Sequence, residues 1–518
     1  MEKYLNNRFL ILYLIPFLIG SLTVFSFQPF NLTIINFLIL PIFFYLILFI
    51  KKKSKSKYRK KPFKKNLFIF GTSFGFGFYL SGIHWITFSL TFDESFKILI
   101  PFALILIPLF LSLFFSIITL TLGPLINSNF SSIFLLSIGL AFSDFMRAKI
   151  LSGFPWNLWA YSFSWTSEIL QPLNYIGLFA FNLLCITLFL IPSVFFFKIN
   201  LSKKILLFLF IPLTLITLYI YGNHNINQNQ KLVNSVENKV NVKVISPNFK
   251  IDYGISEIEI KERLKKLIRY SDPADNLKTL FVWPEGVFSG YNYSQVEKFK
   301  GLFSNFKKNH LIVFGINRLN QDKTGTFNSL VIVDNNFEIQ KEYRKTKLVP
   351  FGEFLPLENF FNKLGFKKIT EGQGSFLEGG IQDNLEIKPM NILPLICYEI
   401  IFPSLTQKSN VDTNLIINVS EDGWFGKTIG PYQHFSKAIF RAIEQNSYLV
   451  RSANKGVSAI INNKGEVIKK LNINETGNIE LEVPLIKSDK KNKNDLIFFI
   501  LLFTYWSFVV VYKKNVKK

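Results

Sequence analysis

The chain has 518 residues, of which 49% are hydrophobic and 16% aromatic, and its formal net charge at pH 7 is +24. This apolar content is too high for one ordinary water-soluble fold, so part of the chain is expected to lie in a lipid bilayer. The positive charge gathers beside apolar segments, where basic residues orient membrane proteins, and we therefore expect no nucleic-acid partner.

Eight apolar segments are expected to cross a bilayer as helices. They lie at residues 9–27, 32–50, 67–90, 98–122, 133–145, 169–197, 205–221 and 496–512. A cleaved signal peptide is the alternative for the first, but no small-residue cleavage site follows it and a second apolar segment comes directly afterwards. If all eight segments span, the basic clusters at 51–65, 198–204 and 513–518 fall on the cytoplasmic side.

Three regions follow from this count. Residues 1–221 form a membrane domain of about seven transmembrane helices, and residues 222–495 form an extracytoplasmic domain. Residues 496–518 supply a C-terminal transmembrane helix and a cytoplasmic tail. Three tryptophans near the end of the fifth span suit an interfacial belt at the depth of the lipid headgroups, namely Trp156, Trp159 and Trp165.

From about Lys239 the hydrophobic pattern becomes that of strands alternating with helices, which indicates an α/β domain. Strands are predicted at 240–245, 280–283, 311–314, 329–333, 393–396 and 415–418. Helices are predicted at 256–271, 294–309 and 434–445. A late hairpin over 457–471 is predicted to turn at Asn462-Asn-Lys-Gly465.

Three predicted strand ends carry side chains suited to acyl transfer: Glu285, Lys345 and Cys397. Catalytic groups of α/β sheets gather beyond the carboxyl ends of the strands, so these three side chains can converge. A carboxylate can take the proton of a thiol, the sulfur can attack an acyl carbon, and an ammonium group can stabilise the resulting oxyanion. Taken singly, each residue also has a purely structural explanation, and for Cys397 it is a small buried thiol.

The four histidines, at positions 84, 224, 310 and 434, show no zinc-ligand spacing. The three-residue set described above is chemically complete without histidine or a metal. We therefore expect neither a metal nor a cofactor.

Longer motifs around these residues resemble the signature blocks of the nitrilase, or carbon-nitrogen hydrolase, superfamily. These motifs are Trp283-Pro-Glu285, Tyr343-x-Lys345-x-x-Leu348-Val-Pro-Phe-Gly-Glu353 and Cys397-Tyr-Glu399. Further motifs, and spans on both sides of the domain, narrow the resemblance to the bacterial apolipoprotein N-acyltransferase family. They are Asp422-Gly-Trp-Phe-Gly426, Gly430-Pro-Tyr-Gln-His434, Arg441-Ala and Arg451-Ser-Ala-Asn-Lys-Gly456.

The resemblance implies a polytopic α-helical membrane part of about eight spans joined to a nitrilase-like αββα sandwich. It implies an acyltransferase of the bacterial cytoplasmic (inner) membrane with its catalytic domain on the periplasmic side. Such an enzyme moves an acyl chain from a membrane phospholipid to the N-terminal α-amino group of diacylglyceryl-cysteine in apolipoproteins. The reaction implied is ping-pong, through a thioester of Cys397.

The resemblance also implies residue roles. Glu285 is the general base, Lys345 the oxyanion stabiliser and Cys397 the nucleophile. Supporting or substrate-binding roles fall to four other residues, namely Glu353, Tyr398, Glu399 and Trp424. The apolar segment 354–372 is either a packed helix and loop or a lid that contacts lipid.

Two other functions remain open from the sequence. A membrane-tethered amidase or nitrilase would use the same three residues to hydrolyse a C–N bond, with water attacking the thioester. A transporter or receptor would use residues 1–221 as a channel. The few charges in those spans beyond Asp144 make an ion pathway hard to build.

Overall fold

The computed structural model describes residues 7–53, 62–252, 254–274, 277–356, 358, 375–407, 413–488 and 494–515. The chain divides by its internal contacts into two compact units. The first comprises Met1–Asn225 together with Lys493–Lys518, and the second comprises Ile226–Asn492. The second unit therefore begins within a helix that continues from the first.

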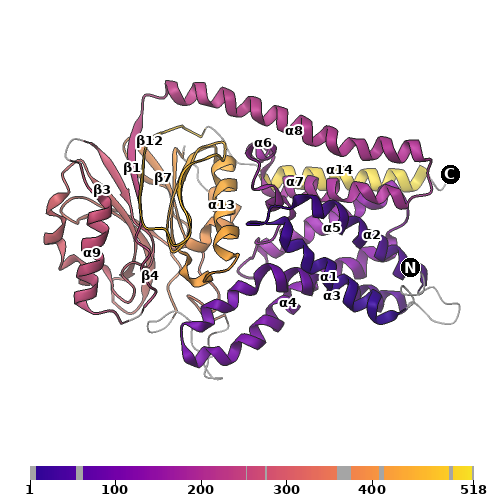
Figure 1. The fold of residues 1–518 in the computed structure, drawn as a ribbon, viewed down its shortest axis with the longest axis horizontal. Coiled ribbons are helices and arrows are strands. Elements are labelled where there is room, and N and C mark those ends of the chain that lie inside the picture. Colours follow the sequence, from indigo (N-terminus) through magenta and orange to yellow (C-terminus); the bar gives the residue numbers. More distant parts are fainter. Residues whose placement is uncertain are drawn as a thin grey trace. The chain divides into compact units, whose positions relative to one another are not determined.

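The first unit is helical (Figure 1). Its helices are α1 (Ile15–Leu22), α2 (Asn36–Lys53), α3 (Pro62–Ile83), α4 (Ile100–Leu122), α5 (Phe130–Lys149), α6 (Ser167–Leu170), α7 (Leu173–Leu190), α8 (Leu201–Ser235) and α14 (Asn494–Asn515). Among the described residues, seven helical stretches, built on α2, α3, α4, α5, α7, α8 and α14, are long and apolar enough to cross a membrane. The predicted multi-span part is thus confirmed, while the first predicted span is a shorter apolar stretch, Leu10–Ser26.

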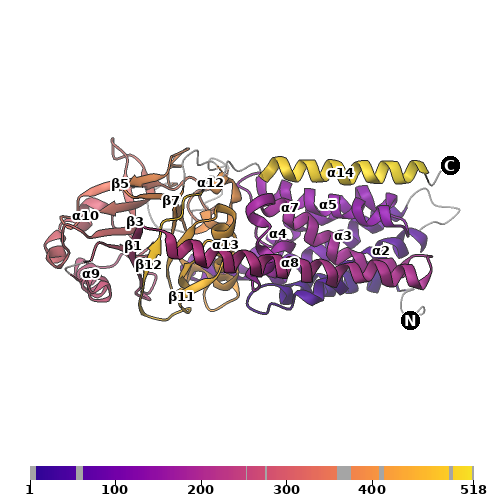
Figure 2. The same ribbon diagram turned by 90° about the horizontal axis from the view of Figure 1, so that it is seen from above.

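Small residues let helices of this unit approach closely. A Cβ atom on Gly71 of α3 would lie 2.8 Å from Ser116 Cα of α4, and one on Gly75 would lie 2.8 Å from Ser112 Cα. Such contacts stabilise helix pairs in lipid, where apolar burial alone does not drive association. On another side of the unit, α14 packs along α5 and α7 (Figure 2).

The intramembrane acid noted in the sequence is paired. Asp144 Oδ1 lies 2.8 Å from Arg147 Nη2, and Asn182 Nδ2 donates to Asp144 Oδ2 at 2.9 Å. The ion pair lies within α5, and the hydrogen bond from Asn182 links it to α7. Charges inside a membrane span are costly unless they are paired in this way.

The tryptophan prediction is wrong for two of its three residues. Trp156 and Trp159 are each only 1% exposed, and the Trp156 ring packs 4.6 Å from that of Trp85. Only Trp165, at 52% exposure, has the accessibility of an interfacial residue. The spacing of the tryptophans could not show that the segment around Trp156 and Trp159 is buried within the helical unit.

The second unit contains two six-stranded sheets among its described residues. The first has the order β12-β1-β2-β3-β4-β5, with β1 (Lys239–Ser246), β2 (Thr279–Val282), β3 (Leu311–Leu319), β4 (Thr326–Val333), β5 (Ile339–Arg344) and β12 (Gly477–Pro484). The second has the order β11-β10-β9-β8-β7-β6, with β6 (Leu385–Ile387), β7 (Met390–Ile396), β8 (Leu415–Glu421), β9 (Tyr448–Asn454), β10 (Ser458–Ile461) and β11 (Val467–Leu471).

The two sheets pack face to face and a helix covers each outer face, which confirms the predicted αββα sandwich. Figure 1 shows α9 (Glu257–Ser271), the two sheets and α13 (Gly430–Gln445) as successive layers of this unit. Between the sheets, Val242 and Val282 face Ile392 and Ile417 in one buried core. Full burial of each such side chain contributes about 1.5–3 kcal/mol.

The predicted helix 294–309 is wrong in extent. The structure has α10 (Tyr293–Glu297) and then a separate 3-10 turn, Lys300–Asn305. The apolar residues keep a helical spacing there, but Gly301 costs about 1 kcal/mol relative to alanine in a helix interior. The segment therefore forms two short pieces. A separate short helix, α12 (Pro403–Gln407), lies later in the chain.

Candidate active site

Four strand ends meet at one end of the sandwich. In the first sheet β2 runs parallel to β3, and β5 has the same direction because β4 is antiparallel to both of its neighbours. In the second sheet β7 and β8 are parallel. Hydrogen bonds described below connect the carboxyl ends of these strands across the two sheets, so residues that follow them converge.

Glu285 stands just beyond β2. Pro284 has no N–H to donate, so the ladder with β3 stops before the acid. Gly315 of β3 leaves room for it, since a Cβ atom there would lie 2.9 Å from Glu285 Cα. Both carboxylate oxygens accept hydrogen bonds, from Asn328 Nδ2 at 2.7 Å and from the N–H of Glu421 at 3.1 Å. The carboxylate is therefore held in one orientation while its side chain stays 12% exposed.

Lys345 follows β5 and is 1% exposed. Its Nζ lies 2.9 Å from Glu353 Oε1 and 3.7 Å from Glu285 Oε1. Asn328 Nδ2 also donates to Glu353 Oε1 at 2.8 Å, and the N–H of Val349 donates to Glu353 Oε2 at 2.9 Å. Burial lowers the pKa of Lys345, but Glu353 and Glu285 together raise it by more than burial lowers it. The net pKa therefore lies above the usual value for lysine. The group is a fixed ammonium ion at neutral pH.

Cys397 follows β7 and begins a tight 3-10 turn, Cys397–Ile401. Its φ is +46°, a left-handed backbone conformation that non-glycine residues adopt rarely and that clusters at functional sites. Burial and the nearby Glu285 raise the pKa of the thiol, and Lys345 lowers it in part. The thiol is therefore neutral at pH 7, and it lies within electrostatic range of both the acid and the ammonium group.

Glu399 joins the two sheets at this end. Its Oε1 accepts hydrogen bonds from Tyr343 Oη at 2.9 Å, from the N–H of Thr346 at 2.7 Å and from the N–H of Lys347 at 3.0 Å. Its Oε2 accepts one from the N–H of Ile396 at 2.8 Å. Burial raises its pKa to about 7, and these backbone donors limit the shift. The side chain thereby fixes the segment that carries Lys345 against the turn that carries the thiol.

The remaining predicted residues lie around this cluster. Tyr398 is half-buried and packs edge-on against Phe402, with ring centroids 5.0 Å apart. Trp424 is half-buried in the turn Asp422–Phe425, which follows β8. The predicted lid, 354–372, lies outside the described residues except at its start.

Sequence reasoning missed several polar residues of the site. Asn328 bridges Glu285 and Glu353, and its only sequence signal is a polar residue inside the apolar strand β4. Glu421 orients Glu285 through its backbone N–H, and Asn454 Nδ2 donates to the Glu421 carboxylate at 2.7 Å. Burial raises the pKa of Glu421 well above its ordinary value.

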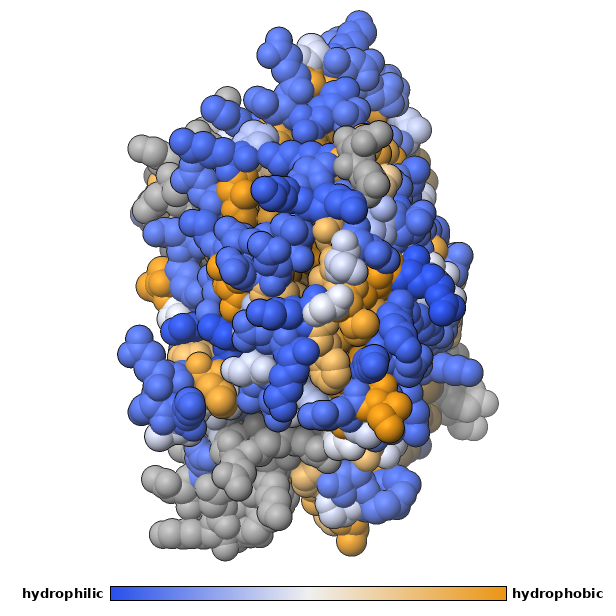
Figure 3. All heavy atoms as spheres, turned by 90° about the vertical axis from the view of Figure 1, so that its left-hand side faces the viewer, coloured by the Kyte–Doolittle hydropathy of each residue, from blue (hydrophilic) through white to orange (hydrophobic). Residues whose placement is uncertain are grey.

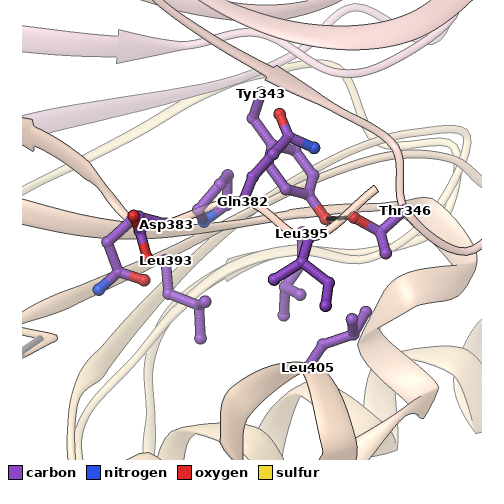
Figure 4. A pocket seen from close by; sticks show the side chains of 10 residues that line it. Tyr343, Thr346, Gln382, Asp383, Leu393, Leu395 and Leu405 are labelled. Atoms are coloured by element: carbon purple, nitrogen blue, oxygen red, sulfur yellow. Dashed lines mark hydrogen bonds between the residues drawn. The ribbon is translucent and has the colours of Figure 1, made fainter. Parts of the chain in front are cut away.

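A pocket beside the cluster is shown in Figure 4. It is lined by Tyr343, Thr346, Ile381, Gln382, Asp383, Asn384, Leu393, Pro394, Leu395 and Leu405. Tyr343 Oη lies 3.2 Å from Thr346 Oγ1, and both residues donate hydrogen bonds to Glu399, Tyr343 from its hydroxyl and Thr346 from its backbone N–H. The lining includes Tyr343 and Thr346 but none of Glu285, Lys345 and Cys397, so this pocket is not the site of the three proposed catalytic residues.

Each of the two units contains a segment that matches the model of a known protein family. Residues 253–489 match the family model for carbon-nitrogen hydrolase, and residues 19–191 match the model for the apolipoprotein N-acyltransferase N-terminal domain. The chain is 30% identical over 486 residues to an apolipoprotein N-acyltransferase of Rhodopseudomonas palustris, covering 91% of this chain and 89% of the relative. It is 33% identical over 451 residues to one of Rickettsia typhi, covering 84% and 88%.

A solved structure is similar to part of this chain at lower identity. Nit3 of Saccharomyces cerevisiae, a member of branch 10 of the nitrilase superfamily, is 17% identical with a TM-score of 0.36. The alignment covers 48% of this chain and 91% of Nit3.

Proposed function

We propose that this chain, which belongs to the apolipoprotein N-acyltransferase family, moves an acyl chain from a membrane phospholipid to the N-terminal α-amino group of diacylglyceryl-cysteine in apolipoproteins. It is an acyltransferase with several membrane-spanning helices. The observation that carries this proposal is the grouping of Glu285, Lys345 and Cys397 at the strand ends. That set is sufficient for acyl transfer without a metal.

In the first half-reaction Glu285 takes the thiol proton while the sulfur of Cys397 attacks the ester carbonyl carbon of the phospholipid. A neutral thiol requires such a base, which agrees with its raised pKa. The carbonyl oxygen becomes an oxyanion, and the Lys345 ammonium stabilises it. The ester C–O bond then breaks, Glu285 gives its proton to the leaving lysophospholipid oxygen, and a thioester remains on Cys397.

In the second half-reaction the α-amino group of the lipoprotein attacks the thioester carbon. An α-amino group has a pKa of about 8, so a useful fraction is neutral near physiological pH. Glu285 accepts the amine proton and passes it to the departing sulfur, which regenerates the thiol and leaves an amide. Lys345 stabilises the same oxyanion position in both halves.

A transfer assay tests the proposal. Purified full-length protein in detergent, incubated with phospholipid and a diacylated lipopeptide, should convert the lipopeptide to a triacylated product detected by mass spectrometry. Cys397→Ala is the matched control and should give no product. Release of free fatty acid without any triacylated peptide would overturn the proposal in favour of the tethered hydrolase, which uses the same residues with water as acceptor.

We further propose that the second unit lies on the periplasmic side of the cytoplasmic membrane. The alternation of basic clusters with neutral or acidic loops supports this orientation. The face of the unit in Figure 3 is mainly hydrophilic, as expected of a domain in water.

Labelling with a membrane-impermeant maleimide tests the orientation in a Cys397→Ala background. A cysteine at Gln230, which is exposed near the end of α8, should react in intact spheroplasts. The neighbouring Asn229 is unsuitable because it is buried in a reciprocal pair of 2.8 Å hydrogen bonds with Asn463. A cysteine at the exposed Lys52 is the control and should react only after the membrane is broken. The reverse pattern would refute the orientation.

A further inference from the structure

A fully buried polar network lies behind the turn that carries Cys397. Its members are Asp422 from the turn after β8, His434 from α13 and Arg451 from β9, each 0% exposed. Arg451 Nη2 lies 2.7 Å from Asp422 Oδ2 and 3.1 Å from His434 Nδ1. His434 Nε2 lies 3.2 Å from the backbone oxygen of Cys397. The network therefore ends on the residue proposed as nucleophile, on its main chain rather than on its thiol.

The partners define the protonation of the network. A backbone carbonyl only accepts, so Nε2 of His434 carries the hydrogen and donates it to Cys397. Nδ1 of the same ring lies 2.9 Å from Asp422 Oδ1 and 3.1 Å from Arg451 Nη2, so Asp422 and Arg451 together hold the side of the ring that faces away from Cys397. Burial raises the pKa of Asp422, but Arg451 and His434 bring it below its ordinary value, so this carboxylate is ionised.

The other donors of Arg451 connect the network to β7, the strand that precedes the Cys397 turn. Its Nη1 donates to Asn418 Oδ1, and its Nε donates to the backbone oxygen of Val457 at 3.3 Å. Asn418 Nδ2 in turn donates to the backbone oxygen of Leu395 at 2.9 Å. Through Asn418 and His434, the Arg451 guanidinium is thus connected to the backbone carbonyls of Leu395 on β7 and of Cys397.

We propose that His434, held by Arg451 and Asp422, is a positioning residue for the nucleophile. Its Nε2–H donates to the Cys397 carbonyl and so keeps that residue at φ +46°, the backbone conformation from which the turn presents the thiol. The left-handed conformation of a non-glycine residue is disfavoured by an energy comparable to one buried hydrogen bond, so the turn relaxes when this bond is lost. The inference rests on the proposed role of Cys397.

Thiol alkylation tests the proposal without any lipid substrate. The rate at which iodoacetamide modifies Cys397 in the full-length protein should fall about tenfold in His434→Leu. His434→Gln should restore the rate to within about threefold of wild type, because its amide N–H can donate to the same carbonyl. A purely structural role would not be rescued in this residue-specific way.

His310→Leu is the matched control. His310 is also 0% exposed, and its Nε2 lies 3.1 Å from the backbone oxygen of Ala274. It precedes β3, so it lies at the opposite end of that strand from the site. His310→Leu should alkylate at the wild-type rate. A wild-type rate in His434→Leu, or equal slowing in both leucine variants, would overturn the proposal.

A second measurement decides the matter if His434→Leu does not fold. In wild-type protein labelled with ¹⁵N-histidine, the signal that disappears in His434→Gln should be that of a ring protonated on Nε2 at pH 7. Protonation on Nδ1 alone would refute the carbonyl contact. If the wild type fails to transfer acyl groups but the alkylation pattern holds, the proposed function fails and the positioning role stands.

Discussion

Incubation with phospholipid alone should add the mass of one acyl chain to the peptide that contains Cys397. The increment is expected because the proposed first half-reaction leaves a thioester, and with no amine present the acyl group has no acceptor other than water. Adding the diacylated lipopeptide should discharge it. Cys397→Ala removes the sulfur, so it should show neither the adduct nor any transfer. Intact-protein and peptide mass spectrometry, sampled over time, checks both steps.

Glu285→Gln serves as the companion variant for this experiment. It keeps the thiol and the shape of the base but cannot accept a proton, so the adduct should form on the order of 100-fold more slowly. An adduct on another residue would contradict the assignment of Cys397. An adduct lost to water as fast as to the lipopeptide would contradict acyl transfer itself.

Lys345→Met should reduce the single-turnover rate of acylation by about 100- to 1000-fold, which is the loss seen when one oxyanion donor is removed. Methionine keeps most of the length of the side chain but removes the charge that faces the developing oxyanion. The rate should be measured by quenched mass spectrometry at saturating phospholipid.

The same substitution leaves Glu353 and Glu285 close together without their cation. Breaking a buried ion pair costs about 3–5 kcal/mol, so the melting temperature should fall as well. Rates must therefore be compared below the melting transition of the variant. Lys347→Met is the control, because that half-buried lysine lies two residues away and should keep near wild-type activity. A Lys345→Met rate within tenfold of wild type would show that the ammonium is not the oxyanion stabiliser.

The sequence predicted best where a chemical group follows an apolar strand. Glu285 and Cys397 each follow such a strand, and the parallel direction of the strands within each sheet places these residues at carboxyl ends, as expected. Strands with weaker apolar patterns were missed. β5 is mostly polar and lies at the edge of its sheet, while β9 carries Arg451 and Asn454 in a fully buried strand.

Polar partners across the fold were the least predictable part. Thr346 and Glu399 are bonded although 53 positions separate them, and Glu285 and Glu421 are separated by 136. Hydrophobic periodicity places strands and helices, but it does not identify which buried donor meets which acceptor. His434 shows the same limit, since the absence of zinc spacing said nothing of its contact with the Cys397 carbonyl.

The pairing of the first and last strands of the second unit determines when this unit can complete its folding during translation. β1 is an inner strand of its sheet only because β12 pairs antiparallel along it, from Lys239 with Pro484 to Ser246 with Gly477. A nascent chain that has been synthesised only as far as Cys397 still lacks β9 and β12, so its first strand presents an open edge to other chains. Synthesis of the final segment therefore both seals that edge and completes the surroundings of the thiol, and a truncated product would be an aggregation hazard rather than a slow enzyme.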